Sequence, residues 1–377
     1  MKIGFVCNEY PPYTCGGIGT FTRELAERLV AQGHEVTVFG VYADVTSPLC
    51  ESLQGVTVYR LPATSGWLGL WRNRRTLYHA IKAAADKGEI EVVEVPDFEG
   101  YATFWGALPI SVLVRLHGTV TYFNHELNKP HSRVIKWLEQ KTLARADRLL
   151  SVSQYAAEKT LNIFALDKPF TVIHNGIAWP DASACKQDYS YSGLVVFTGT
   201  LMAKKGVFAL AQAWPEVQAI FPDARLVLIG KDTQDEGQSA WQRIEQLAGA
   251  QARITHTGHI AKAELQTHLV NADIAIFPSF SESFGLGPVE AMALAVPTIY
   301  TQLSCGPEII THERDGILIN PAQPSTISQA IIKLLFDQGK RKHFGAAGRQ
   351  HAAIFSVAAQ IAHNEQAYQQ SIEANSV

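Results

Sequence analysis

The chain has 377 residues, of which 47% are hydrophobic and 18% are charged, and its formal net charge is −3. This length exceeds one typical hydrophobic core and predicts two domains, and this composition excludes a disordered chain. The near-neutral net charge gives no global indication of a nucleic-acid-binding protein, so we expect no nucleic-acid partner.

The cysteine pattern indicates a cytoplasmic protein. The chain has five cysteines, and none of them forms a CxxC pair. They are Cys7, Cys15, Cys50, Cys185 and Cys305. We therefore expect reduced thiols, without a disulfide framework or a zinc site. The apolar run near the amino terminus stops at Asn8 and is too short for the core of a signal peptide. The sequence contains no run of about 18 apolar residues, so we expect no membrane-spanning helix.

The first half of the chain alternates strand-like apolar runs with helical periodicity. A helix is predicted over residues 20–32, and Gly33 is placed to end it. This alternation predicts right-handed β-α-β crossovers and a parallel sheet, which form a first Rossmann-like domain over residues 1–176. The strands predicted in this domain are 2–7, 35–39, 112–116 and 148–152.

The same alternation begins again after a turn-rich linker near residues 175–192. A helix over 207–220 follows the first strand of a second Rossmann-like domain, which we expect over residues 177–355. The last segment, 356–377, is predicted as a helix that could cross back onto the first domain. Two such domains predict a ligand cleft between them, at the carboxyl ends of their strands. The strands predicted in the second domain are 194–198, 225–230, 254–257 and 273–278.

Residues 279–297, SFSESFGLGPVEAMALAVP, place two acids around a glycine-rich turn. Gly285 permits close backbone approach to a ligand, and Pro288 suits the first position of a helix. The amino end of that helix presents N–H groups that can hold a phosphate. Glu282 and Glu290 can then accept hydrogen bonds from sugar and ribose hydroxyls. The alternative is that Glu290 only favours the helix start and that Glu282 is a solvated loop acid.

The stretch 271–321 resembles the donor-binding region of retaining glycosyltransferases of family 4 (GT4). That family carries two glutamates separated by seven residues, and Glu282 and Glu290 have this spacing. The adjacent FG and EAMA match as well, and GGIGTFTRELAERLVAQGHEVTVF resembles the family's first loop and helix. The resemblance implies a GT-B fold, which consists of two doubly wound α/β Rossmann-like domains with a cleft between them. The first domain would then bind the acceptor and the second the nucleotide sugar.

The resemblance also assigns roles to residues. Glu282 is expected at the transferred sugar, Glu290 at the ribose, and Lys205 of the loop GTLMAKKG at the diphosphate. Thr200 stands where the family usually has an arginine. Lys204 is either a compensating cation or a solvated surface lysine. Other residues expected at the donor are Gly16, Gly17, Gly199, Thr200, Ile260, Ser283, Phe284, Gly285 and Leu286.

His117 completes the expected catalytic set with Glu282 and Lys205. It follows a predicted strand and is expected to line the cleft near the sugar, and the alternative is a loop histidine with satisfied hydrogen bonds. The first glycine loop has the form GGxG instead of GxGxxG, and no acid ends the second strand, which disfavours a nicotinamide cofactor. The sequence has no pair of acids of the DxD type in a suitable place, so we expect no bound metal.

The expected reaction is retaining transfer of a hexose from a nucleotide-diphosphate sugar, without a metal ion. UDP-glucose or a related UDP-sugar is the donor expected from the family. The acceptor is expected to be a saccharide or lipid-linked hydroxyl in surface polysaccharide or glycolipid assembly. Retention is expected through front-face substitution, or else through attack by Glu282 as a nucleophile. The alternatives are an epimerase or phosphorylase of the same fold and a non-catalytic nucleotide-sugar-binding protein, towards which only Thr200 points.

The segment 66–85 combines aromatic with basic side chains. Such a segment suits peripheral contact with anionic lipid at the inner face of a membrane, or a lipid-linked diphosphate acceptor. The alternative is a core-packed helix with a solvated basic end. The residues expected at the membrane are Trp67, Trp71, Arg72, Arg74 and Arg75.

Overall fold

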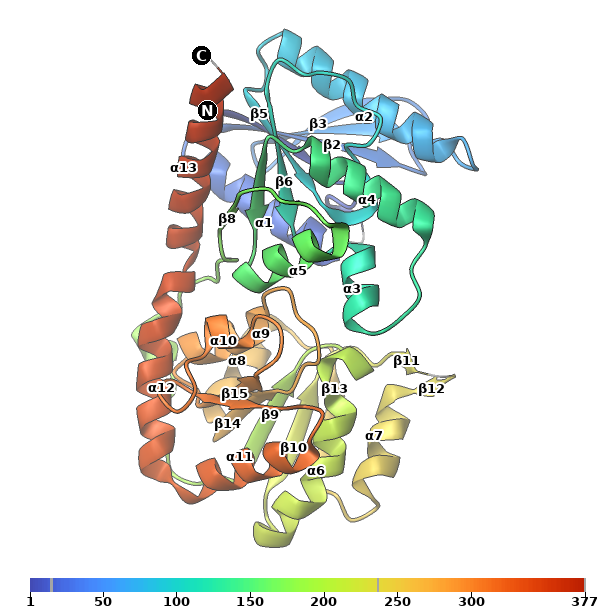
Figure 1. The fold of residues 1–377 in the computed structure, drawn as a ribbon. Helices are drawn as coiled ribbons and strands as arrows, with labels where there is room; N and C mark the ends of the chain where they lie inside the picture. The colour runs from blue at the N-terminus through green and yellow to red at the C-terminus, as the bar shows by residue number, and fades with distance from the viewer. Residues whose placement is uncertain (14–15, 236, 376–377) are drawn as a thin grey trace. The chain divides into compact units, whose positions relative to one another are not determined.

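The computed structural model describes residues 1–13, 16–235 and 237–375 (Figure 1). The chain divides into two compact units. Unit 1 comprises Met1–His174 together with Gln360–Val377, and unit 2 comprises Asn175–Ala359. Sequence analysis placed the first domain boundary after residue 176.

Unit 1 is built on a sheet with the strand order β3-β4-β2-β1-β5-β6-β7-β8. The edge strand β3 pairs antiparallel with β4, and the other neighbouring strands are parallel. The four strands predicted for this domain are confirmed with small shifts at their ends. The strands are β1 (Lys2–Val6), β2 (Glu35–Tyr42), β3 (Leu49–Leu53), β4 (Val56–Pro62), β5 (Val92–Pro96), β6 (Ser111–Leu116), β7 (Arg148–Ser151) and β8 (Phe170–Val172).

The helices of unit 1 cover its sheet (Figure 1). The first helix begins at Gly17, three residues before the predicted start, and Gly33 follows its end with a φ of 86°. The helices of this unit are α1 (Gly17–Ala31), α2 (Gly69–Asp86), α3 (Val120–Glu126), α4 (Arg133–Arg145), α5 (Gln154–Phe164) and the part of α13 (Val357–Asn375) that begins at Gln360, with a short 3-10 turn, η1 (Phe98–Gly100).

A buried polar network attaches the carboxy-terminal helix α13 to the sheet of unit 1. Arg115 on β6 donates to both carboxylate oxygens of Glu94 on β5, at 2.6 and 2.8 Å. The same guanidinium donates to Asn364 on α13, and the hydroxyl of Tyr368 donates to Glu94 at 2.7 Å. All four side chains are buried, so α13 is held by charged hydrogen bonds as well as by apolar packing.

Unit 2 is a second parallel sheet, with the strand order β13-β10-β9-β14-β15-β16. The predicted strand 194–198 and helix 207–220 are confirmed with the same bounds. Its strands are β9 (Leu194–Thr198), β10 (Arg225–Ile229), β13 (Ile254–Gly258), β14 (Ile274–Phe277), β15 (Thr298–Thr301) and β16 (Ile317–Ile319), and β11 (Gln234–Asp235) and β12 (Gln238–Ser239) form a small hairpin. Its helices are α6 (Val207–Ile220), α7 (Ala240–Ala248), α8 (Lys262–Asn271), α9 (Leu286–Ala293), α10 (Gly306–Ile309), α11 (Pro324–Phe336) and α12 (Gln338–Ala352), with the 3-10 turns η2 (Ala182–Ala184), η3 (Ala203–Lys205) and η4 (Ala353–Phe355).

Two loops of unit 2 meet at the carboxyl ends of the central strands β9 and β14. Gly206 follows η3 with a φ of 73°, and a Cβ atom on it would lie 1.8 Å from the carbonyl oxygen of Pro278. The amide of Phe280 donates to the carbonyl of Lys204 at 2.8 Å. A glycine is therefore required for the loop after β9 to lie directly against the loop after β14.

Within the described part of the chain, no helix combines the length and the apolar character needed to cross a bilayer. The described cysteines, Cys7, Cys50, Cys185 and Cys305, are all free thiols, and Cys15 lies outside the described residues.

Candidate functional site

Lys205 and Glu282 are in direct contact where the two loops of unit 2 meet. The Nζ atom of Lys205 lies 2.5 Å from Oε1 of Glu282. The Ser279 hydroxyl donates to the same oxygen at 2.9 Å, and the Glu282 amide donates to the Ser304 hydroxyl at 3.2 Å. The lysine side chain is 27% exposed and the glutamate 12%, so the ion pair is sheltered but still open to a ligand.

The charge balance around Glu282 keeps its carboxylate ionised. Burial alone would raise the pKa of Glu282, but Lys205, Lys204 and the Ser279 hydroxyl outweigh it and lower that pKa. Burial lowers the pKa of Lys204, while the charge of Glu282 opposes this shift. Lys204 is thus half-buried within the electrostatic reach of Glu282, and its description as a solvated surface lysine is wrong.

Helix α9 begins directly after the loop that carries Glu282. Its first residue is Leu286 instead of the predicted Pro288, because Gly285 takes a left-handed conformation and serves as the N-cap without a side-chain cap. A Cβ atom on Gly285 would lie 2.2 Å from the hydroxyl of Tyr300, so this turn also requires glycine. Glu290 consequently lies beyond the first turn of α9, and a role as an N-terminal capping acid is wrong.

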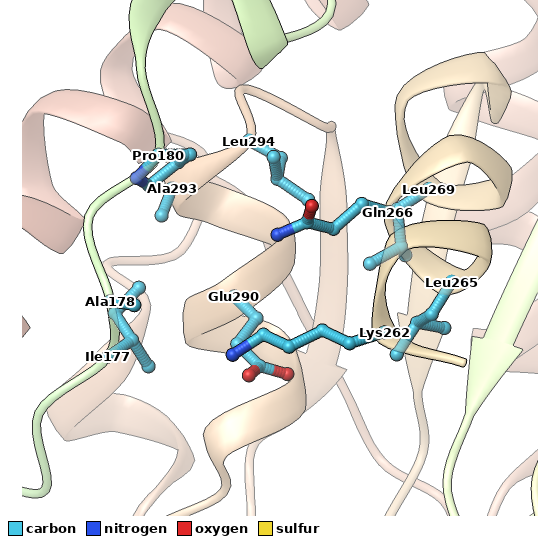
Figure 2. A pocket seen from close by; sticks show the side chains of 10 residues that line it. All are labelled: Ile177, Ala178, Pro180, Lys262, Leu265, Gln266, Leu269, Glu290, Ala293 and Leu294. Atoms are coloured by element: carbon cyan, nitrogen blue, oxygen red, sulfur yellow. The ribbon is translucent and has the colours of Figure 1, made fainter. Parts of the chain in front are cut away.

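Glu290 faces a separate pocket between α9 and α8 (Figure 2). Figure 2 shows the side chain of Lys262, the first residue of α8, extending into this pocket toward the carboxylate of Glu290. The walls are otherwise mainly apolar, as is usual where a few polar groups orient a ligand. The lining residues are Ile177, Ala178, Pro180, Lys262, Leu265, Gln266, Leu269, Glu290, Ala293 and Leu294.

The other residues predicted at the donor in unit 2 lie on loops at the carboxyl ends of its strands, except Leu286, which begins α9. Gly199 and Thr200 follow β9, and Ile260 lies between β13 and α8. These three are partly buried, as are Ser283 and Gly285, whereas Phe284 is buried and Leu286 is exposed. The Phe284 ring packs edge-on against Phe355 at 5.6 Å, which makes it a structural support of the loop.

The glycine loop of unit 1 is held by an acid that sequence analysis did not identify. Gly16 is the N-cap of α1 and Gly17 its first residue. The carboxylate of Glu9 accepts hydrogen bonds from the amides of Gly16, at 3.0 Å, and Gly19, at 2.6 Å. Gly16 and Gly17 were predicted to approach a donor phosphate, and in this conformation the carboxylate of Glu9 occupies the amide of Gly16.

His117 is fixed by a second acid that the sequence did not reveal. The carboxylate of Asp97, directly after β5, accepts hydrogen bonds from the amides of His117 and Gly118, each at 3.1 Å. The ring of His117 contacts Phe21 of α1 with centroids 4.6 Å apart, so it lies beside the start of that helix. Burial and the charge of Arg115 lower the pKa of His117 to about 3, which keeps the imidazole neutral at physiological pH.

The signal for Asp97 was present in the chain but weak. It ends the run EVVEVPD, and a polar residue directly after a buried strand often carries function. Burial raises the pKa of Asp97 to about 8, although both amide hydrogen bonds oppose that shift. No comparable pattern marks Ser279 or Ser304, because single serines are common in loops.

Part of the predicted membrane segment is wrong. Arg74 is buried, and its guanidinium donates to the carbonyls of Leu70, Glu99 and Gly100, which makes it a structural residue. Trp67 and Trp71 are exposed, as is Arg72. Arg75 is half-buried and donates to the carbonyl of Phe104 at 3.2 Å.

Among the described residues, no group of three or more histidine, cysteine, aspartate or glutamate side chains is placed to hold a metal ion. Lys204 and Lys205 supply positive charge beside Glu282.

Two family models match the chain. The model described as Glycosyltransferase Family 4 matches residues 15–178, and the model described as Glycosyl transferases group 1 matches residues 192–337. Together they span most of both units.

The similarity to known proteins covers nearly the whole chain. An uncharacterized glycosyltransferase of Methanocaldococcus jannaschii is 26% identical over 366 residues, which cover 91% of each chain. The solved structure of sucrose-phosphate synthase from Thermosynechococcus elongatus has a TM-score of 0.77 at 23% identity and covers 99% of both chains. A protein of Anabaena solved in complex with UDP and glucose has a TM-score of 0.73 at 16% identity, over 98% of this chain and 100% of its own.

Proposed function

Because the chain belongs to the family 4 glycosyltransferases and has the GT-B fold, we propose that it transfers a hexose from a nucleotide-diphosphate sugar to an acceptor hydroxyl with retention of configuration. The observation that supports this best is the contact between Lys205 and Glu282 beside the amino end of α9. A cation, a helix start and a carboxylate together suit a pyrophosphate that bears a sugar.

Leaving-group stabilisation is the first task of this site. The bond between the anomeric carbon and the diphosphate breaks while negative charge grows on the phosphate oxygen. Lys205 and the amides at the start of α9 are placed to accept this charge, and one such donor contributes roughly 3–4 kcal/mol to transition-state stabilisation. Ion pairing with Glu282 holds the ammonium group in a fixed position before the donor binds, which lowers the cost of reorganisation.

The ionised state of the Glu282 carboxylate determines its proposed role. Its lowered pKa leaves an ionised carboxylate that accepts hydrogen bonds from sugar hydroxyls and does not donate a proton. We propose front-face substitution, in which the acceptor hydroxyl forms the new bond on the face that the phosphate leaves, and the departing phosphate oxygen takes the hydroxyl proton. Trapping of a glycosyl group on Glu282 would instead establish it as a nucleophile.

The donor is proposed to be UDP-glucose or a related UDP-sugar. The support is the likeness in fold to a protein solved with UDP and glucose, together with the pocket at Glu290, whose carboxylate suits a ribose diol. Lys262 extends toward that carboxylate and is placed to orient it (Figure 2).

The acceptor is proposed to be a saccharide or lipid-linked hydroxyl, used on the cytoplasmic side of a membrane in surface polysaccharide or glycolipid assembly. Neutral His117 is suited to hydrogen bonding with a sugar hydroxyl rather than to supplying a charge. Metal independence also stays a proposal. A transfer rate that is unchanged by EDTA is expected, and a rate restored only by added Mg²⁺ or Mn²⁺ would contradict it.

The direct test is a panel of nucleotide sugars, read first by thermal shift and then by slow hydrolysis of the donor. The expected result is stabilisation by UDP-sugars and release of UDP in the presence of one of them. The variant Glu282→Gln should still be stabilised by UDP but should release it far more slowly. Stabilisation without any turnover on a wide acceptor panel would favour a binding protein, and interconversion of two UDP-sugars without UDP release would favour an epimerase.

A further inference from the structure

Unit 1 exposes large apolar side chains near the amino-terminal ends of two helices. Trp67, just before α2, is 85% exposed, Trp71 on α2 is 50% exposed, and Trp137 on α4 is 43% exposed. Exposed apolar side chains that gather in one place mark interaction sites. The aromatic surface is defined here as Trp67, Leu70, Trp71, Phe104, Val134 and Trp137, all of them exposed.

Hydrogen bonds and close packing bring these segments together. The buried Arg74 ties α2 to η1 through the Gly100 carbonyl at 2.9 Å. A Cβ atom on Gly100 would lie 2.4 Å from the Leu138 carbonyl, so α4 packs directly on η1. The rings of Phe104 and Trp137 lie 5.7 Å apart. These contacts make α2, the loop after η1 and α4 neighbours within unit 1, where Figure 1 shows the two helices.

The two segments that carry most of the aromatic surface, residues 63–85 and 127–146, have a positive net charge. Residues 63–85 include no acid, and the one acid among residues 127–146, Glu139, is buried. Lys141 lies with its ammonium 6.0 Å from the centre of the Trp137 ring. Since the whole chain has a net charge of −3, this positive charge is local. The exposed basic residues in these two ranges include Arg72, Lys129, Arg133 and Lys141.

We propose that the aromatic surface docks unit 1 onto a lipid bilayer with anionic headgroups. Tryptophan is favoured at the interface between lipid and water, because its ring is apolar and its indole N–H is polar. The flanking lysines and arginines are attracted by anionic headgroups. A side chain as protruding as Trp67 would need a matching pocket on a protein partner, whereas a fluid bilayer accommodates it without one. This contact is independent of the sugar that the enzyme transfers.

Flotation of the full chain with vesicles tests this contact. One set of vesicles contains phosphatidylcholine alone, and the other contains phosphatidylcholine and phosphatidylglycerol in equal amounts. The protein should float with the anionic vesicles, sink with the neutral ones, and be released by high salt because the attraction is screened. Failure to float with anionic vesicles at low salt would overturn the proposal.

Matched variants assign the contact to this surface. The double variant Trp67→Ser/Trp71→Ser should lower the partition coefficient about tenfold or more, and Arg72→Gln should lower it about fivefold. The controls are Ile354→Ser and Arg253→Gln, which alter exposed residues of unit 2 and should change nothing. All five positions are exposed, so unaltered folding can be checked by thermal melting. Equal flotation of the tryptophan variant and the wild type would contradict the assignment.

Tryptophan fluorescence separates lipid from protein as the occupant. Vesicles of brominated phosphatidylglycerol should quench the emission of the wild type, and quenching should fall in the variant Trp67→Phe/Trp71→Phe/Trp137→Phe. A dimer that is lost in the serine variant, together with no quenching by brominated lipid, would show that a second copy of the chain covers the aromatic surface instead.

Discussion

The ammonium group of Lys205 lies 2.5 Å from Glu282. The lysine side chain is partly exposed, so an anionic ligand can reach it. Replacing it with methionine keeps the length of the side chain and removes the charge. We predict that Lys205→Met lowers kcat/KM for the sugar donor by a factor that corresponds to about 3–4 kcal/mol. Steady-state kinetics at saturating acceptor measure it.

Two further lysines calibrate that loss. Lys204→Met should have a smaller effect, because burial lowers the pKa of Lys204 and disfavours its charged form, whereas the ammonium of Lys205 lies 2.5 Å from Oε1 of Glu282. Lys87→Met, at a surface position that is 69% exposed, should leave the kinetics unchanged. Equal losses in all three variants would mean that net charge, and not the position of Lys205, matters.

His117 is predicted to stay neutral throughout the physiological range. Because burial and Arg115 lower its pKa to about 3, the folded protein disfavours the imidazolium form. The sign follows directly: folding loses stability as the pH falls below the ordinary histidine pKa of 6.5, since the unfolded chain binds the proton first. Nitrogen-detected NMR of the imidazole should show no titration of His117 between about pH 5 and 8. A midpoint within that range would refute the neutral state.

At the residue scale the sequence singled out candidate side chains but not the contacts between them. The seven-residue spacing identified both Glu282 and Glu290, and the loop GTLMAKKG identified Lys205. The contact between Lys205 and Glu282 depends on how two loops pack, which no local pattern encodes. Asp97 escaped notice for the same reason, because its role is to bind amides that lie twenty residues further along the chain.

Among the elements, the meeting of the η3 and β14–α9 loops depends on one glycine. Gly206 has a φ of 73° and no room for a Cβ atom beside Pro278, whereas Gly33 has a φ of 86° with open space around it. We predict that Gly206→Ala destabilises the protein by clearly more than the roughly 1–2 kcal/mol that a left-handed backbone alone costs an L-residue. Urea unfolding of Gly206→Ala and of the wild type measures this loss of stability.

Gly33→Ala is the matched control, because it has the same backbone strain without the clash. A Gly206→Ala variant no less stable than Gly33→Ala would show that the two loops can separate without cost. Donor binding by both variants, followed by calorimetry, should be impaired only in Gly206→Ala.

Element boundaries were predicted less well than element types. The strand 194–198 and the helix 207–220 were located correctly, since both have long apolar patterns. Helix α9 begins two residues before Pro288, because Gly285 turns the chain earlier than proline statistics suggest. Strand β3 was not predicted, since an exposed edge strand has no apolar alternation to reveal it.

At the scale of the whole molecule, the last helix packs in unit 1 although it lies far from the rest of that unit in the sequence. Residues from Gln360 onward belong to unit 1 and bury a network of Glu94, Arg115, Asn364 and Tyr368. We predict that Arg115→Met costs about 3–5 kcal/mol of stability, because it leaves the carboxylate of Glu94 buried without its cation. Chemical unfolding followed by circular dichroism measures this cost.

The milder variant Tyr368→Phe removes one hydrogen bond to Glu94 and should cost only about 1.5–3 kcal/mol. A loss for Arg115→Met no larger than that for Tyr368→Phe would mean that Glu94 is protonated or hydrated in the folded protein, contrary to the network described here.

We propose that Lys205, Glu282 and the start of α9 hold a diphosphate, while Glu290 holds a ribose. Calorimetric titration of UDP and of uridine into the wild type, Lys205→Met and Glu290→Gln tests it most directly. Lys205→Met should weaken the binding of UDP but leave the binding of uridine unchanged, and Glu290→Gln should weaken the binding of both. Wild-type affinity of Lys205→Met for UDP would contradict it.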